Sequence, residues 1–396
     1  MKVGDPVYRG SQVHLPVEVL SYILSFVASF HDLKIQSTIW ACCLVSRSWY
    51  AASISHLYAH PLLDNRNFDK FARTLCPPIN SHKPRVGLEN FIKHLDMGGL
   101  AYESSKSLTA RLIRRTRNSL LSFAAPAVTF SIACLAPLSK CANLQVLDLS
   151  SDSYDMSLRQ LLDSIGHLEH LTSLRLPRNA LRGRCNLQPK SHWPRRLQSL
   201  QISDLLYDEI ESWAALFESW PDTLRTLRIA ECKAYGSLHS LDPTILTANT
   251  VHCLEIGLSG HDDPLPFRKI LKTFPSLTTL IFPAFQAEQM AKWKGLDEYL
   301  ADMQTGAYLN DVDHESLLEV LVCTEQYPAA SPAPVLSVEI LAKYVHKFPR
   351  LRRLKVPERF AQLDTSDSIK GYEQLSDRLE ERAAPAARLS SGLFFC

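Results

Sequence analysis

The segment LTSLRL at residues 171–176 carries the pattern that decides the fold. It has apolar residues at its first, fourth and sixth positions, and LQVLDL, LQSLQI, LRTLRI, VHCLEI and LTTLIF share this spacing. The fourth positions recur every 26 or 27 residues, at Leu147, Leu174, Leu200, Leu227, Leu254 and Leu280. A period this regular indicates an array of stacked structural units.

Looser copies extend the array in both directions. Their fourth positions are Leu95 in IKHLDM, Phe123 in LLSFAA, Leu321 in LEVLVC and Leu354 in LRRLKV. In each unit we expect a short strand whose three apolar side chains point into a core, and neighbouring strands should stack in one parallel sheet. The other residues of each period, about 20, are enough to return through a helix on the opposite side.

This pattern resembles the leucine-rich repeat family from residue 88 to residue 357. The resemblance implies an α/β solenoid with a parallel concave sheet and convex helices. Helical periodicity is present between strands at 158–168, 208–220 and 267–274. Two repeats extend to the family's longer form, in which Asn179 and Cys232 occupy a position that hydrogen-bonds the backbone at a turn. The resemblance therefore implies a structural role for both residues.

The period breaks near the carboxy terminus. Leu280 and Leu321 are 41 residues apart, and Leu321 and Leu354 are 33 residues apart. We expect long loops in the resulting insertions at 283–316 and 323–348. Beyond residue 357 the sequence predicts one helical stretch at 372–383 and then a low-complexity end, so we assign 358–396 to a carboxy-terminal tail.

A second motif lies near the amino terminus. The apolar segment LPVEVLSYILSFV (15–27) is followed by WACCLVSRSWY (40–50). A Leu-Pro pair, an acidic residue two positions on, an apolar helix and a Val-x-x-x-Trp helix resemble the F-box. The resemblance covers residues 13–58 and implies a short all-α domain of three helices. The matching positions are Leu15, Pro16, Glu18, Leu20, Ile23, Leu24, Val45 and Trp49.

F-box proteins with such repeats are substrate receptors of Skp–cullin–F-box (SCF) ubiquitin ligases. The resemblance therefore implies a Skp-type adaptor at the F-box, a cullin bound through it, and an unidentified protein target on the repeats. Ubiquitin is transferred on other subunits, so no catalytic role is expected here. The alternative is a repeat scaffold or inhibitor without a ligase, in which residues 13–58 only cap the solenoid. The expected adaptor contacts are Leu15, Pro16, Leu20, Ile23, Leu24, Val45 and Trp49.

The fifth position of each repeat should point away from the core onto the concave face. Opposite charges on adjacent strands at this position, as in Asp148 beside Arg175, can neutralise one another across the sheet. Ile281 and Val322 are apolar on an otherwise polar face, where they have no core to serve. We therefore expect the target on the carboxy-terminal half of this face. The expected target contacts are Asp148, Arg175, Arg228, Glu255, Ile281 and Val322.

Composition excludes several classes of protein. Of the 396 residues, 46% are hydrophobic and 21% are charged, which is typical of a globular chain. A net charge of +2 provides no overall field for binding nucleic acid or a membrane surface. Residues 118–139 lack a formal charge over about the length of a membrane span, but they contain two prolines and the Phe123 repeat. We expect a strand, a loop and a helix there.

Sequence motifs for catalysis are absent. The chain has no GxxxxGK[ST], GxGxxG, HExxH or GxSxG motif, so we expect no catalytic residue and no cofactor. The ten cysteines are scattered without zinc-site spacing, so no metal is expected. These cysteines, together with the lack of an Asn-x-Ser/Thr sequon, favour a reducing compartment, and we expect the cytoplasm, the nucleus or both.

Overall fold

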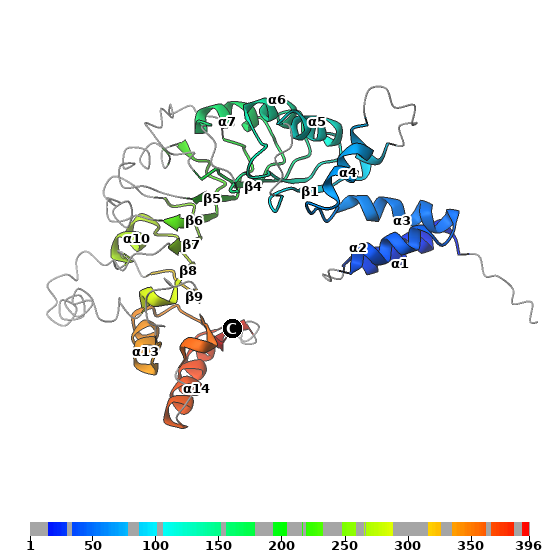
Figure 1. Ribbon diagram of the computed structural model, residues 1–396. Helices are drawn as coiled ribbons and strands as arrows, with labels where there is room; N and C mark the ends of the chain where they lie inside the picture. The colour runs from blue at the N-terminus through cyan, green and yellow to red at the C-terminus, as the bar shows by residue number, and fades with distance from the viewer. Residues whose placement is uncertain are drawn as a thin grey trace, which may run out of the picture.

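The chain forms a small helical domain followed by a curved solenoid (Figure 1). One sheet of eleven parallel strands, in sequence order, follows the inside of the curve. The computed structural model describes residues 15–29, 34–77, 87–100, 106–151, 156–178, 193–203, 216, 219–232, 248–258, 265, 267–287, 316–325, 335–361, 366–383 and 390–395.

The amino-terminal domain consists of α1 (Val17–Ser29), α2 (Ile35–Cys43) and α3 (Arg47–Ala59). Helix α1 begins directly after Pro16, whose carbonyl oxygen accepts the Leu20 N–H at 3.2 Å. A proline suits this place because its missing N–H would have no partner within the helix. Ser46 caps α3 by accepting the Trp49 N–H at 3.3 Å. The three helices enclose their own small core of Leu20, Leu24, Ile39 and Ala52.

The junction with the solenoid is made by the end of α3 and by α4 (Phe68–Leu75). The Lys93 N–H, next to the first strand, donates to the Ala59 carbonyl at 3.1 Å. Phe68 and Leu75 of α4 belong to the solenoid core. A solenoid needs its terminal repeat covered, and α4, together with the end of α3, covers it here. Helices α1 and α2 lie outside that core.

Every fourth-position residue predicted from the repeats lies in a strand, and the predicted parallel sheet is confirmed. Neighbouring fourth positions pair directly, as in Leu147 with Leu174 and Leu227 with Leu254. The strands are β1 (His94–Asp96), β2 (Ser122–Ala124), β3 (Val146–Asp148), β4 (Ser173–Arg175), β5 (Ser199–Ser203), β6 (Thr226–Cys232), β7 (Cys253–Leu258), β8 (Thr279–Pro283), β9 (Val320–Thr324), β10 (Arg353–Val356) and β11 (Gly392–Phe395).

The apolar positions of each repeat hold this register. Leu227 and Leu280 are 0% exposed, and Leu254 is 1% exposed. Burying a leucine side chain contributes roughly 1.5–3 kcal/mol. Because side chains alternate between the two faces of a sheet, a slip of one residue would move these leucines into solvent. The repeat therefore fixes both the strand and its register.

Helices line the outside of the curve (Figure 1). The predicted helices at 158–168 and 267–274 are confirmed as α7 (Leu158–Ile165) and α10 (Phe267–Thr273). Residues 118–139 contain β2, a 3-10 turn η2 (Ile132–Cys134) and α6 (Leu135–Leu138), as expected. Helix α5 (Lys106–Thr116) also lies on the outside of the curve. In the described part of the chain, no helix is both long and apolar enough to cross a membrane.

Some predictions fall on residues that are not described. Asn179 and most of the predicted helix at 208–220 lie outside the described residues. Cys232 lies at the end of β6, but its side chain is outside the description. The same holds for residues 288–315 and 326–334 of the two insertions.

The second insertion differs from the prediction. Residues 323–348 were expected to be loop, but α13 (Val338–Lys347) occupies part of them, so the prediction was wrong for this stretch. Ser337 caps the helix by accepting the Ile340 N–H at 3.4 Å. Leu341, Tyr344 and Val345 are buried at helical spacing, and this apolar stripe holds the helix against the sheet.

The sheet also continues beyond residue 357, where no strand was predicted. The 3-10 turn η3 (Glu358–Phe360) leads to α14 (Ser366–Glu381), which contains most of the predicted helical stretch at 372–383. The chain then returns to add β11 beside β10, with Gly392 opposite Arg353. Gly392 has φ +120°, a conformation that glycine adopts readily and other residues avoid. Tyr372 and Leu375 of α14 join the solenoid core.

Candidate protein-docking surfaces

Helix α1 carries two apolar stripes on different sides. Leu20 and Leu24 point into the core of the helical domain, and Val27 packs against it. The second stripe is Val19, Tyr22, Ile23 and Phe26, at spacing i, i+3, i+4 and i+7, which we call the outer stripe. These side chains are 42%, 65%, 40% and 54% exposed. A surface helix needs one apolar stripe to pack against its own domain. The outer stripe is therefore not required for the fold of the domain.

The turn between α2 and α3 adds further apolar surface. Leu44 and Val45 are 67% and 65% exposed. The turn is fixed by backbone hydrogen bonds, because the Val45 N–H donates to the Cys42 carbonyl at 3.2 Å. Trp40 on α2 is 56% exposed. Large exposed apolar side chains gathered in one small domain mark a site of protein or membrane interaction.

The structure corrects the predicted adaptor contacts at two positions. Leu20 and Leu24 are 2% and 0% exposed, so they form the domain core and cannot meet a partner, and their assignment was wrong. Leu15, Pro16, Ile23 and Val45 lie at the surface. Trp49 is half-buried against the domain core. The contact of these five residues with an adaptor stays a prediction. Sequence reasoning missed Trp40 and Leu44.

Polar and cysteine side chains of this domain serve its packing. The Ser21 hydroxyl and His56 Nε2 lie 3.3 Å apart and tie α1 to α3. Burial lowers the pKa of His56, so this imidazole is held neutral near pH 7. Burial raises the pKa of the Cys43 thiol, which disfavours a reactive thiolate. Cys43 is buried, as a packing role requires.

The concave face is lined by the fifth positions of the repeats, which lie in one row across the sheet. Their strands alternate between half-buried or exposed residues and a buried central residue, as predicted. Direct pairing brings each member beside the next, from β1 to β11. The members of this fifth-position row are Asp96, Ala124, Asp148, Arg175, Gln201, Arg228, Glu255, Ile281, Val322, Lys355 and Phe394.

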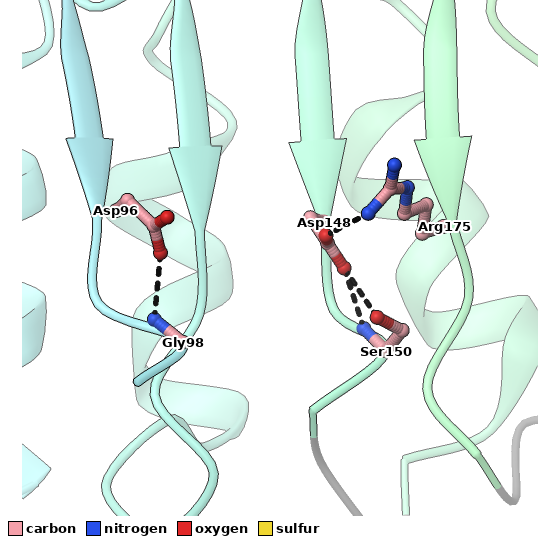
Figure 2. A network of polar contacts seen from close by, with 5 residues as sticks. All are labelled: Asp96, Gly98, Asp148, Ser150 and Arg175. Atoms are coloured by element: carbon pink, nitrogen blue, oxygen red, sulfur yellow. Dashed lines mark hydrogen bonds and ion pairs between the residues drawn. The ribbon is translucent and has the colours of Figure 1, made fainter. Parts of the chain in front are cut away.

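In the first seven strands of this row, two pairs of opposite charges on neighbouring strands lie within ion-pair distance. Arg175 Nη1 lies 2.8 Å from Asp148 Oδ2, and Asp148 also accepts the Ser150 N–H and hydroxyl at 2.9 and 2.6 Å (Figure 2). Asp96 accepts the Gly98 N–H at 2.9 Å (Figure 2). The predicted ion pairing across the strands is therefore confirmed here, at about 0.2–1 kcal/mol for an exposed pair.

The second predicted pair is also formed, since Arg228 Nε lies 3.1 Å from Glu255 Oε1. Beyond it the character of the row changes. Ile281 and Val322 lie directly opposite one another on β8 and β9. Lys355 follows on β10 and Phe394 on β11. The structure thus brings the predicted apolar pair together, whereas the binding of a target there stays a prediction.

Comparison with known proteins finds a matching family for the amino-terminal domain. Residues 13–64 match the F-box-like family model. The F-box protein YDR306C of Saccharomyces cerevisiae is 31% identical over 189 residues, which are 48% of this chain and 37% of that protein. Protein pof5 of Schizosaccharomyces pombe is 27% identical over 277 residues, or 68% of this chain and 73% of its own. The match with the budding-yeast protein thus spans little more than a third of that relative.

Among solved structures, a leucine-rich repeat (LRR) protein of Leptospira interrogans, LIC12759, is similar with a TM-score of 0.33 and 13% identity. The match covers 76% of this chain and 62% of that one.

The domain of α1–α3 is thus an F-box-like domain, and it stands in front of a solenoid of strand-and-helix repeats. The chain is similar to F-box proteins, and its solenoid has the strand-and-helix repeat pattern of leucine-rich repeats.

Proposed function

We propose that this chain is the substrate-recognition subunit of an SCF-type ubiquitin ligase. The F-box-like domain binds a Skp-type adaptor, and through it a cullin. The repeats bind the target protein. The chain itself contributes proximity and orientation, which convert a bimolecular transfer into one within a complex, while ubiquitin is transferred on other subunits.

The outer stripe is the observation that carries this proposal. Four apolar side chains of α1 face solvent although the domain core is already filled by Leu20, Leu24, Ile39 and Ala52. The exposed turn residues Leu44 and Val45 belong to the same domain. Fully burying such side chains against a partner contributes roughly 1.5–3 kcal/mol each, so the domain is suited to a stable protein contact.

The alternative of a domain that only caps the solenoid accounts for less. Capping is achieved by α4 and the end of α3, whose Phe68, Leu75 and Tyr58 pack with the solenoid core. Helices α1 and α2 enclose a separate core. The exposed apolar face on these two helices is not needed for capping, and it favours a contact with a further protein. A direct test of adaptor binding therefore separates the two functions.

The first prediction concerns the start of α1. The double variant Leu15→Ala, Pro16→Ala should reduce co-purification of a co-expressed Skp-type adaptor by more than about tenfold, since an apolar anchor at an interface typically contributes about 2 kcal/mol or more. Leu15 is 39% exposed, so the F-box core should be preserved. Adaptor recovered per mole of chain is the measurement.

The matched control is Val128→Ala, which shortens another half-exposed apolar side chain on the solenoid, at 50% exposure. It should leave adaptor recovery unchanged. Equal recovery with wild type and with the Leu15, Pro16 variant would remove these residues from the interface. A wild-type chain that retains no adaptor at all would favour the scaffold function.

A further inference from the structure

The end of the concave face differs from the rest in both apolarity and charge. Its last four strands present the fifth-position residues Ile281, Val322, Lys355 and Phe394, paired side by side. The third-position residues of the same strands form a parallel row of Thr279, Val320, Arg353 and Gly392. We call these eight positions the terminal panel. They contain two cations and no carboxylate.

The two cations of the terminal panel stand apart from the other arginines of this region. Arg352 is paired with Glu319 at 2.7 Å, and Arg359 with Glu325 at 3.3 Å. Within the described parts of the chain, neither Arg353 nor Lys355 has a carboxylate within ion-pair distance. Among the described residues, this positive charge thus lies uncompensated beside an apolar pair, and such a surface complements an anionic partner.

Arg353 is held in place for such a contact. Its guanidinium carbon lies 4.9 Å from the centroid of the Phe394 ring, a cation–π arrangement that restricts the side chain. Its Nε is buried and has no hydrogen-bond partner among the described residues. A buried donor without a partner is costly. Little conformational freedom is lost when a partner engages a side chain that is already fixed.

We propose that the terminal panel binds an extended segment of the target that carries an apolar side chain and, two or three residues away, an aspartate or glutamate. This inference rests on the proposed role of the repeats in binding the target. The apolar side chain covers Ile281 and Val322, and the carboxylate lies between Lys355 and Arg353. The partner is thus a protein with an accessible acidic segment.

The spacing follows from the sheet. Neighbouring strands are about 4.8 Å apart, so the step from the apolar pair on β8 and β9 to the cation on β10 is about 5–10 Å. An extended peptide advances about 3.3 Å per residue. Two or three residues therefore cover the step. One ammonium and one stacked guanidinium suit a single carboxylate, whereas phosphate recognition usually uses clusters of arginines.

Selection of peptides by the full chain tests the proposal. The probe is a displayed library of random twelve-residue peptides. Wild type should enrich sequences with an apolar residue two or three positions from Asp or Glu. Lys355→Glu should instead enrich Lys or Arg at the acidic position. Arg159→Gln is the matched control, because Arg159 lies on the outer helix α7, where it is already paired with Asp163 at 4.0 Å, and it should select the wild-type sequences.

The affinity of one selected peptide measures how much Lys355 contributes to binding. The peptide should bind the Lys355→Gln variant about tenfold more weakly than wild type, and its affinity should fall with added salt as a charge contact requires. If Lys355→Glu does not fold, the weaker binding of this peptide to Lys355→Gln still tests the role of Lys355. A peptide with Gln in place of the acidic residue should likewise bind wild type about tenfold more weakly.

Three outcomes would overturn the proposal. Wild type enriches no sequence; Lys355→Glu enriches the same acidic sequences as wild type; or a phosphoserine version of the selected peptide binds far more tightly than the carboxylate version. Adaptor capture by the same preparations is measured separately. Loss of adaptor binding alone would count against the proposed ligase role and leave peptide recognition by the panel intact.

Discussion

Replacing Tyr22 and Phe26 with aspartate should weaken adaptor binding by more than about 100-fold, or about 2.7 kcal/mol. Both rings belong to the outer stripe and are 65% and 54% exposed in the chain alone. They contact one another edge to face, with centroids 4.8 Å apart. An adaptor seated on α1 would have to bury two unpaired carboxylates, which is strongly unfavourable. Titration of the purified chain with adaptor measures the change.

Ser25→Asp is the matched control, since it introduces the same charge on the same helix. Ser25 is exposed, and its hydroxyl donates to the Tyr22 carbonyl at 2.7 Å. Aspartate at this position therefore carries the same cost to helix stability without entering the outer stripe. This variant should retain most of the affinity. If the double variant bound as tightly as Ser25→Asp while remaining folded, the outer stripe would not be the docking surface.

The second large effect concerns the solenoid core. Phe123→Ala should lower the free energy of unfolding by about 3–5 kcal/mol, because it removes a large buried ring and leaves a cavity. Phe123 is 0% exposed, and its ring lies 6.1 Å from that of Phe130. It also pairs with the fourth positions on both sides, Leu95 and Leu147. Urea denaturation followed by circular dichroism gives the change.

Val128→Ala provides the comparison, since Val128 follows the same strand but is half-exposed. It should change the free energy of unfolding by less than about 0.5 kcal/mol, as most surface substitutions do. Similar urea midpoints for the two variants would mean that the Phe123 repeat is not part of the continuous core.

The repeats were predictable because each one encodes its strand locally. Three apolar side chains at fixed spacing must point to one face, so Leu147, Leu174 and their counterparts specify strand, register and neighbour together. Strand β11 has a weaker signal, because Leu393 and Phe395 occupy the fourth and sixth positions but Ser390 stands where the repeat has its first apolar residue. Its place depends on packing against α14, where the Leu393 N–H donates to the Ser376 hydroxyl at 3.1 Å.

The docking surface on α1 was only partly predictable for a related reason. The motif marks an apolar helix, and its two stripes have the same spacing, so the sequence alone does not show which stripe faces the core. The structure assigns Leu20 and Leu24 to the core and leaves Tyr22 and Ile23 outside. On the concave face the sequence alone was sufficient. Side chains alternate along a strand, so the pattern already placed Ile281 and Val322 on the side away from the core.

Amide hydrogen exchange of the chain, with and without a Skp-type adaptor, tests most directly whether one end of the molecule binds the adaptor and the other stays available for a target. Binding should slow exchange in α1 and around the turn at Leu44 and Val45. Exchange in strands β8–β10 should not change. Protection of those strands by the adaptor, or unchanged exchange in α1 at saturating adaptor, would contradict this account.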